Sequence, residues 1–280
     1  KLMHTICKIR TRGLEITSNS VNIYTKDFKW NTDLMFAITN EEITKLYNVK
    51  EDDPGNSWFI GKPVNVFYDY KADGIWQLED AEELEKWGGV FKPGDIKIVD
   101  KNGDYKITSD DRFILGQVEP KFTLSMSNYF NYKNFDLNFF LNGAFGQMRK
   151  FERNWSLNGR YNGARVNYWR IIGEDANGNP ISNGSNEAPR PNRDYENPSY
   201  IDALYYSKSS FVRLKSVTLG YNLPASAIKA LGISKLRIYG SVDNVFVITD
   251  YKGIDPELGN KDDNKGFNEP VPRTYRVGVN

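Results

Sequence analysis

The chain alternates apolar and polar residues with a period of two in several stretches, which is the pattern of a β-strand with two different faces. The clearest stretch is residues 135–142. Phe135, Leu137, Phe139 and Leu141 share one face, and Asp136, Asn138, Phe140 and Asn142 share the other. A soluble sandwich would bury the apolar face, whereas an outer-membrane barrel would turn it toward lipid. Alternation in this stretch alone leaves both possibilities open.

The lengths of the connections favour the barrel. About seven strands are predicted, and they are joined alternately by short and by long segments. Short turns on one side and long loops on the other are typical of outer-membrane barrels, and several long structureless connections are unusual in a compact soluble domain. The predicted strands cover residues 14–23, 28–38, 122–130, 135–143, 211–221, 235–248 and 273–280; the short connections cover 24–27, 131–134 and 224–232, and the long ones cover 39–119, 144–208 and 251–272.

Two local features refine this pattern. The apolar parity changes between Leu214 and Val217, so we expect a β-bulge near Lys215 and Ser216. Aromatic residues gather at the short connections, where an interfacial girdle of a barrel would lie.

An odd number of strands does not fit a single-chain bacterial barrel, so we expect further strands before Lys1.

Composition excludes several classes of function. The mean hydropathy is −0.60 and the sequence contains no long apolar run, which excludes a transmembrane helix but not a barrel of alternating strands. The net charge of +1 gives no reason to expect nucleic acid as a partner. With one histidine, His4, and one cysteine, Cys7, the chain cannot assemble a histidine triad or an internal disulfide. The acidic residues 79–85 belong mostly to a predicted solvated helix, 80–86, so we do not expect an enzyme, and a glycosidase ranks third.

Residues 100–111 follow the spacing of a calcium-binding loop. Asp100, Asn102 and Asp104 occupy its positions 1, 3 and 5, Lys106 offers a backbone carbonyl at position 7, and Asp111 stands at position 12. Tyr105 replaces the usual glycine, and Asp111 replaces the usual glutamate. The sequence therefore predicts a structural Ca²⁺ site in a long loop, and a solvated turn before a strand is the alternative.

Tryptophans in the long segments are candidate contacts for substrate. Their flat faces can pack against sugar rings, although a loop tryptophan often forms the small core of its own loop. The candidates are Trp58, Trp76, Trp87, Trp155 and Trp169.

A series of short motifs runs along nearly the whole chain. In order, they are RGLE (12–15), KDFKW (26–30), IGKP (60–63), YKADGIWQ (70–77), PGDIK (93–97) leading into 100–112, SFVRLK (210–215), VTLGY (217–221), NVF (244–246), YKGIDP (251–256) and PRTY (272–275). In their order and spacing these motifs resemble the C-terminal barrel region of the SusC/RagA type of TonB-dependent outer-membrane transporters.

This resemblance implies more than the spacing does. Such a transporter is a transmembrane antiparallel β-barrel of about 22 strands with long extracellular loops, an N-terminal plug and a segment that contacts TonB. It works with a SusD-like surface lipoprotein and imports oligosaccharides or peptides. Residues 1–280 are then expected to be the C-terminal portion of one barrel domain, without the plug and the earlier strands. The competing hypothesis is a soluble all-β carbohydrate-binding module with a structural calcium loop.

Overall fold

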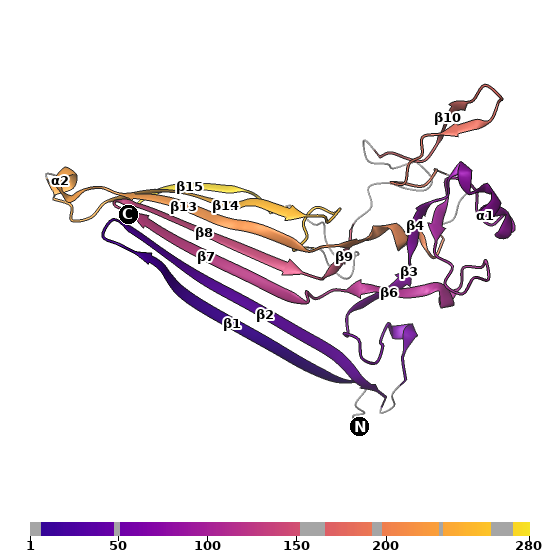
Figure 1. Cartoon of the computed structure of the whole chain (residues 1–280), viewed down its shortest axis with the longest axis horizontal. Helices are drawn as coiled ribbons and strands as arrows, with labels where there is room; N and C mark the ends of the chain where they lie inside the picture. Colours follow the sequence, from indigo (N-terminus) through magenta and orange to yellow (C-terminus); the bar gives the residue numbers. More distant parts are fainter. Residues whose placement is uncertain (1–6, 48–50, 152–165, 192–197, 230–231, 259–270) are drawn as a thin grey trace. The chain divides into compact units, whose positions relative to one another are not determined.

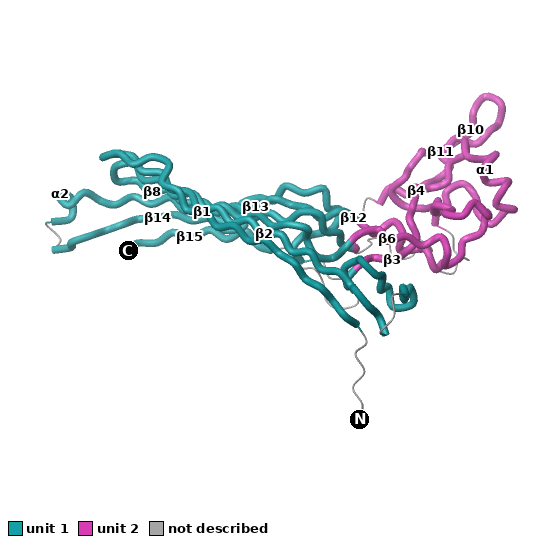
Figure 2. The backbone as a smooth tube through the Cα atoms, turned by 60° about the horizontal axis from the view of Figure 1, so that its bottom comes forward, with its two compact units in different colours: residues 1–65, 117–149, 207–280 teal, residues 66–116, 150–206 magenta. Residues whose placement is uncertain are grey.

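The computed structural model describes residues 7–47, 51–151, 166–191, 198–229, 232–258 and 271–280. The chain divides into two compact units (Figure 2). Unit 1 comprises residues 1–65, 117–149 and 207–280, and unit 2 comprises residues 66–116 and 150–206. Among the described residues, no helix combines the length and the apolar composition that crossing a bilayer requires.

The main element of unit 1 is a single antiparallel sheet, and its described residues form seven strands in chain order (Figure 1). All seven predicted strands are confirmed, and the first two extend well beyond their predicted ends. The strands are β1 (Cys7–Tyr24), β2 (Phe28–Leu46), β7 (Phe122–Tyr132), β8 (Phe135–Phe145), β13 (Phe211–Asn222), β14 (Arg237–Thr249) and β15 (Thr274–Val279). Unit 1 also holds the short helices η1 (Pro54–Asn56) and α2 (Ala225–Ile228).

The strand register divides the side chains of the sheet between a mainly apolar face and a mainly polar face. Leu137 on β8 stands opposite Phe130 on β7 and Leu219 on β13. We call this side the apolar face, and one row across it reads Ile23, Trp30, Phe130, Leu137, Leu219, Gly240 and Val277. The other side is the polar face, and a row across it reads Asn19, Asp33, Ser127, Phe140, Ser216, Asp243 and Thr274.

The apolar face is open along much of its length. Leu14 and Ile16 on β1 are 54% and 50% exposed, and Leu219 on β13 is 53% exposed. A contiguous apolar surface of this kind marks a contact with another apolar medium or partner. The buried core therefore does not lie against this face.

Aromatic rings line the end of the sheet that carries the short turns. Trp30 stacks on Phe130 with ring centroids 5.5 Å apart, and Phe135 meets Tyr221 at 4.7 Å. Trp30 also donates from Nε1 to Asn128 Oδ1 at 2.9 Å, which gives the indole N–H a partner. The predicted aromatic clustering at the short connections is confirmed.

The predicted bulge is also confirmed. The register between β13 and both of its neighbours shifts between Leu214 and Ser216, at Lys215. On β14 the shift falls at Asn244 and Val245, and the backbone of Asn244 has a left-handed φ of 53°. The bulge restores one apolar face, because Leu214 and Val217 then point the same way.

An ion pair crosses the polar face between strands that are not neighbours. Arg237 on β14 donates from Nε to Asp136 Oδ1 on β8 at 2.9 Å, passing over the intervening strand β13. The residue beneath it is Gly220, where an added Cβ would lie 2.4 Å from the guanidinium. Glycine is needed here because any side chain would displace the arginine.

A buried arginine fixes the segment that follows β14. Arg213 is 3% exposed, and its Nη2 donates to both oxygens of Asp255 at 2.8 Å. Its Nε lies 2.6 Å from Glu257, which also pairs with Lys215 at 2.9 Å. Arg213 and Lys215 thus both pair with one acidic segment of the long connection.

Unit 2 consists of the larger part of each long connection that follows β2 and β8, so segments predicted as loops carry their own structure. Tyr70, Ile96 and Ile98 from the first connection pack with Ala188, Ile201 and Tyr205 from the second. Its elements are β3 (Val66–Tyr70), β4 (Ala72–Ile75), η2 (Leu78–Asp80), α1 (Ala81–Lys86), β5 (Ile96–Ile98), η3 (Ser109–Asp111), β6 (Arg112–Gln117), β10 (Ile171–Glu174), β11 (Pro180–Ser182) and η4 (Ile201–Tyr205). Two further strands, β9 (Met148–Lys150) and β12 (Tyr206–Lys208), pair with each other.

Polar contacts hold the two connections of unit 2 together. Arg190 Nε pairs with Asp95 Oδ1 at 2.9 Å, and Tyr206 donates from its hydroxyl to Asp69 Oδ2 at 2.6 Å. The amide of Ile75 donates to Asn186 Oδ1 at 2.9 Å. Unit 2 therefore has both an apolar core and specific links between segments far apart in the sequence.

Replacing Asp255 with alanine should destabilise the protein by about 3 kcal/mol, because it leaves Arg213 buried with an incomplete set of partners. The measurement is urea unfolding of the protein in detergent micelles, followed by tryptophan fluorescence. Asp250→Ala is the matched control, since Asp250 is exposed, and it should stay within about 0.5 kcal/mol of the parent protein. Equal stability of the two variants would contradict the role given to Arg213.

Candidate functional site

The predicted calcium loop lies in unit 2, between β5 and η3. Asp100 accepts the backbone N–H of Gly103 through Oδ1 and that of Tyr105 through Oδ2, both at 2.7 Å. Asn102 Oδ1 accepts from the Asp104 amide at 3.1 Å, and Asp104 Oδ1 accepts from the Lys106 amide at 2.9 Å. The loop is thus a series of tight turns closed by its own side chains.

Tyr105 takes the position where a calcium loop usually has glycine. Its φ is 57°, so the backbone adopts the left-handed conformation that this position requires. Its ring meets Trp87 edge-on with centroids 5.7 Å apart. That contact fastens the loop to the aromatic core of unit 2 and explains why a large residue is tolerated there.

Asp111 closes the loop from a buried position. It is fully buried, and its oxygens accept from the backbone amides of Lys101 at 3.0 Å and Thr108 at 2.8 Å. It therefore caps the turn that leads into η3, and each oxygen that the sequence pattern offers to calcium already accepts a hydrogen bond from the protein. The predicted loop geometry is present, and the carboxylate predicted at position 12 already has protein partners.

The charge on Asp100 is part of what holds the loop. Burial alone would raise the pKa of its carboxyl, but hydrogen bonds from the amides of Tyr105 and Gly103 outweigh this effect and lower the pKa below its ordinary value. A lowered pKa in the folded state stabilises the fold above the unfolded value of about 3.9. This contribution is lost as the pH falls through the pKa of the folded state.

Within the residues that the structure describes, no three His, Cys, Asp or Glu side chains lie close enough together to hold a metal ion. Asn102 and the carbonyl of Lys106 would have to join the carboxylates as ligands. Calcium binding by Asp100, Asn102, Asp104, Lys106 and Asp111 stays a prediction.

Three of the five candidate tryptophans form the core of unit 2. Trp76, Trp87 and Trp169 are 0%, 4% and 5% exposed, so their faces pack against the protein and present no surface to a sugar ring. In this structure they have a packing role, and contact of any of the five tryptophans with substrate stays a prediction. Trp58 is half-buried in unit 1, and Trp155 lies outside the described residues.

The packing around these tryptophans is specific. Trp76 and Trp87 meet edge-on at 6.3 Å, and Lys97 Nζ lies 4.2 Å from the centroid of the Trp76 ring. Trp169 Nε1 donates to Gln77 Oε1 at 3.0 Å. The rings link the two connections instead of facing a path for substrate.

Unit 1 contains a pocket that sequence analysis missed. It has a volume of about 240 Å³ and lies where β2 and β7 meet the adjoining connections. Ala37, Thr39 and Glu41 contribute from alternate positions of β2, and Thr123 stands opposite Ala37. The remaining lining residues are Pro63, Gln117, Glu119, Pro120 and Phe122.

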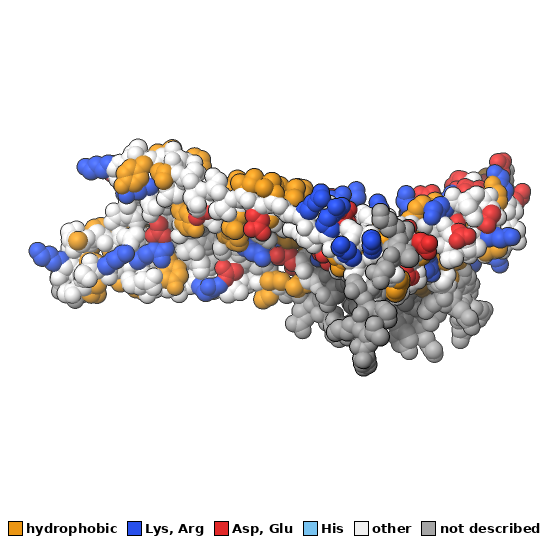
Figure 3. Space-filling view, turned by 90° about the horizontal axis from the view of Figure 1, so that it is seen from below, with side chains coloured by type: hydrophobic (Ala, Val, Ile, Leu, Met, Phe, Trp, Pro, Cys, Tyr) orange, Lys and Arg blue, Asp and Glu red, His pale blue; other side chains and the backbone are white. Residues whose placement is uncertain are grey.

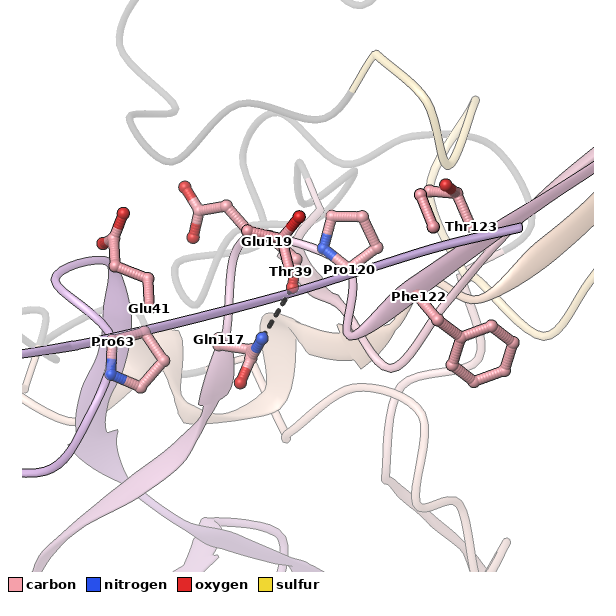
Figure 4. Close-up of a pocket in the computed structure, with 9 residues that line it drawn as sticks. Thr39, Glu41, Pro63, Gln117, Glu119, Pro120, Phe122 and Thr123 are labelled. Atoms are coloured by element: carbon pink, nitrogen blue, oxygen red, sulfur yellow. Dashed lines mark hydrogen bonds between the residues drawn. The ribbon is translucent and has the colours of Figure 1, made fainter. Parts of the chain in front are cut away.

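Two carboxylates give this pocket its chemical character. Glu41, Glu119 and Thr123 project to the same side of β2 in Figure 4, and Phe122 points the other way. Glu119 accepts from Asn65 Nδ2 at 2.8 Å, and Glu41 accepts from the Val64 amide at 3.4 Å. Carboxylates beside two prolines suit the hydroxyl or ammonium groups of a small polar ligand.

The sequence held no clear signal for this pocket. The predicted strand ended at residue 38, so Thr39 and Glu41 fell into a predicted loop. Thr39, Asn40, Glu41 and Glu42 are all polar, so the alternation of apolar and polar residues stops after Ile38. The strand continues to Leu46 in the structure, and its register places Thr39 and Glu41 on the polar face.

No family model matches the chain. TonB-dependent receptor P3 of Formosa agariphila is 29% identical across 99% of this chain, and TonB-dependent receptor SusC of Bacteroides thetaiotaomicron is 27% identical across all of it. The alignments cover 29% and 27% of these relatives, so the chain spans less than a third of their length.

Solved structures agree in fold. A structure of the RagAB peptide transporter matches 98% of this chain with a TM-score of 0.71 at 22% identity, and the chain covers 29% of that protein. The RagAB peptide importer in its open-open state matches with a TM-score of 0.69 at 21% identity. The resemblance to the SusC/RagA type of transporter is thereby confirmed over almost the whole chain.

Replacing Asp104 with alanine should abolish one calcium site, because it removes a ligand from the centre of the loop. The measurement is calorimetric titration of calcium into the protein in detergent micelles. Asp110→Ala is the matched control, since Asp110 is exposed and lies outside the predicted ligand set. If both variants bind calcium as the parent does, residues 100–111 are a turn without a metal.

Proposed function

We propose that this chain forms part of the wall of a TonB-dependent outer-membrane importer of the SusC type. The observation that carries the proposal is the seven-stranded sheet within the described residues, with its exposed apolar face and its polar opposite face. A barrel wall has lipid on one side and a wet lumen on the other, and needs this division. The names of the relatives support the same function.

Strand length also supports a membrane location. β1 has 18 residues and β2 has 19, which is more than the 9–11 residues or so that a tilted strand needs to cross a bilayer. The additional residues extend β1 and β2 beyond the hydrocarbon layer, at the end of the sheet that bears the long connections. Long connections of barrels lie outside the cell and short turns lie in the periplasm, so unit 2 is extracellular in this proposal.

The proposed substrates are oligosaccharides or peptides. The RagAB relatives are named as a peptide importer and a peptide transporter, whereas the resemblance to SusC suggests glycans. The pocket beside Glu41 and Glu119 could accept hydroxyl groups from a sugar or an ammonium group from a peptide. Burial of three tryptophans removes the main sequence argument for stacking on sugars.

The proposed partners are TonB and a SusD-like surface lipoprotein. TonB is proposed because the relatives are named as TonB-dependent receptors, and the lipoprotein because the chain resembles SusC. TonB would act through a region outside residues 1–280, and the lipoprotein would close over the extracellular side. A soluble carbohydrate-binding module fits less well, since it would bury its apolar face.

Import can be tested in cells that carry the complete protein. Uptake of a fluorescent oligosaccharide or a fluorescent peptide should require the protein, and it should stop when a protonophore collapses the energy supply of TonB. The control is a deletion strain complemented with the parent gene. An import function would be refuted if the oligosaccharide and the peptide each entered the cells equally fast with and without the protein.

The sidedness of the sheet can be tested with single cysteines in a Cys7→Ser background. Asn177→Cys lies in the exposed turn between β10 and β11, and Lys133→Cys lies in the short turn between β7 and β8. An impermeant thiol reagent added to intact cells should label position 177 and spare position 133. Labelling of position 133 alone would invert the proposed topology.

A further inference from the structure

The apolar face of β1 changes character toward the start of the strand. Leu14 and Ile16 lie on this face, and the next three positions of the same parity toward the N-terminus are Arg12, Arg10 and Lys8. Lys45 on β2 stands opposite Lys8. We call Lys8, Arg10, Arg12 and Lys45 the basic strip.

The register shows that the strip belongs to the apolar face. Arg12 pairs with Asn40 and Arg10 pairs with Glu42, two and four positions beyond Ile38, which lies opposite Leu14. Successive side chains on one face of a strand are about 6.6–6.8 Å apart. The strip therefore begins one step beyond the last apolar pair and extends about 13 Å further along β1.

The strip is accessible, and it carries a strong local charge. All four basic residues are exposed, and Figure 3 shows Lys and Arg side chains gathered where a hydrophobic band ends. The acidic residue on this face is Glu42, which accepts from Arg10 Nε at 2.6 Å. Four cations and one carboxylate leave a local charge of about +3, compared with +1 for the whole chain.

A surface cavity adjoins three residues of the strip. Its volume is about 590 Å³, and Lys8, Arg10 and Lys45 line it on one side. The rest of its lining is Ile9, Glu42, Ile43, Thr44, Ile60 and Gly61. The Thr44 hydroxyl donates to the Lys8 carbonyl at 2.9 Å, which holds β2 close to β1 at the bulge there. The cavity has room for a phosphate group among several N–H donors.

We propose that the basic strip binds the phosphate groups of anionic lipids at the border of the hydrocarbon layer. The inference rests on the proposed function, in which the apolar face meets lipid. Cations placed immediately beyond such a face reach the headgroup region, where anionic phosphates lie. In the proposed topology this end is extracellular, so the lipids are those of the outer leaflet.

The test is binding of phosphatidylglycerol to the complete protein in neutral detergent micelles, with phosphatidylcholine as the zwitterionic reference. Lys8→Gln/Arg12→Gln removes two charges without breaking the bond between Arg10 and Glu42. Binding of phosphatidylglycerol should weaken about twenty-five-fold, at about fivefold for each charge. The matched control is Lys86→Gln/Lys92→Gln in unit 2, where both lysines are exposed and lie outside the sheet, and it should bind as the parent does.

Other outcomes separate the possible failures. Equal binding of the two lipids by the parent protein, or equal binding of phosphatidylglycerol by both double variants, would overturn the inference and leave the membrane location intact. Full competition by soluble glycerol phosphate at the lipid concentration would show a free anion site, and would also overturn the inference. A protein that stays monomeric without detergent and binds neither lipid would refute the proposed function itself.

Discussion

The structure of unit 1 depends on the pleat of the β-strand, which sends successive side chains to opposite faces. Antiparallel pairing in register then joins seven short alternating patterns into two continuous surfaces. A slip of one residue in any strand would exchange its two faces. The bulge at Lys215 shows how this is avoided, because it corrects a change of parity within β13 and keeps Leu214 and Val217 on one side.

The sequence was sufficient to predict the strands, because alternation is a local property. It also predicted the bulge and the aromatic cluster, which follow from parity and from position near a turn. It did not predict unit 2, because the contacts of Tyr70 and Ile98 with Ala188 and Tyr205 join segments about a hundred residues apart. For the same reason, a tryptophan that packs inside a loop could not be distinguished in the sequence from one that faces a substrate.

The ends of the strands carry most of the chemistry that goes beyond the fold. At one end of β1 and β2 the polar face leads to Glu41 and the pocket, while the apolar face leads to the basic strip. Both features arise because the strands continue past the predicted apolar region. Side chains still alternate between the two faces there, but polar and charged residues replace the apolar ones. The segment 100–111 differs, since its geometry is fixed by hydrogen bonds within the loop.

The central claim is that one face of the sheet meets lipid and the other meets water. It can be tested most directly by placing a nitroxide spin label at each position from 136 to 142 of β8 in lipid nanodiscs. Collision rates with oxygen should peak at Leu137, Phe139 and Leu141, and rates with a water-soluble nickel complex should peak at Asp136, Asn138 and Asn142. Uniform accessibility along the strand, or the opposite phase, would contradict the account.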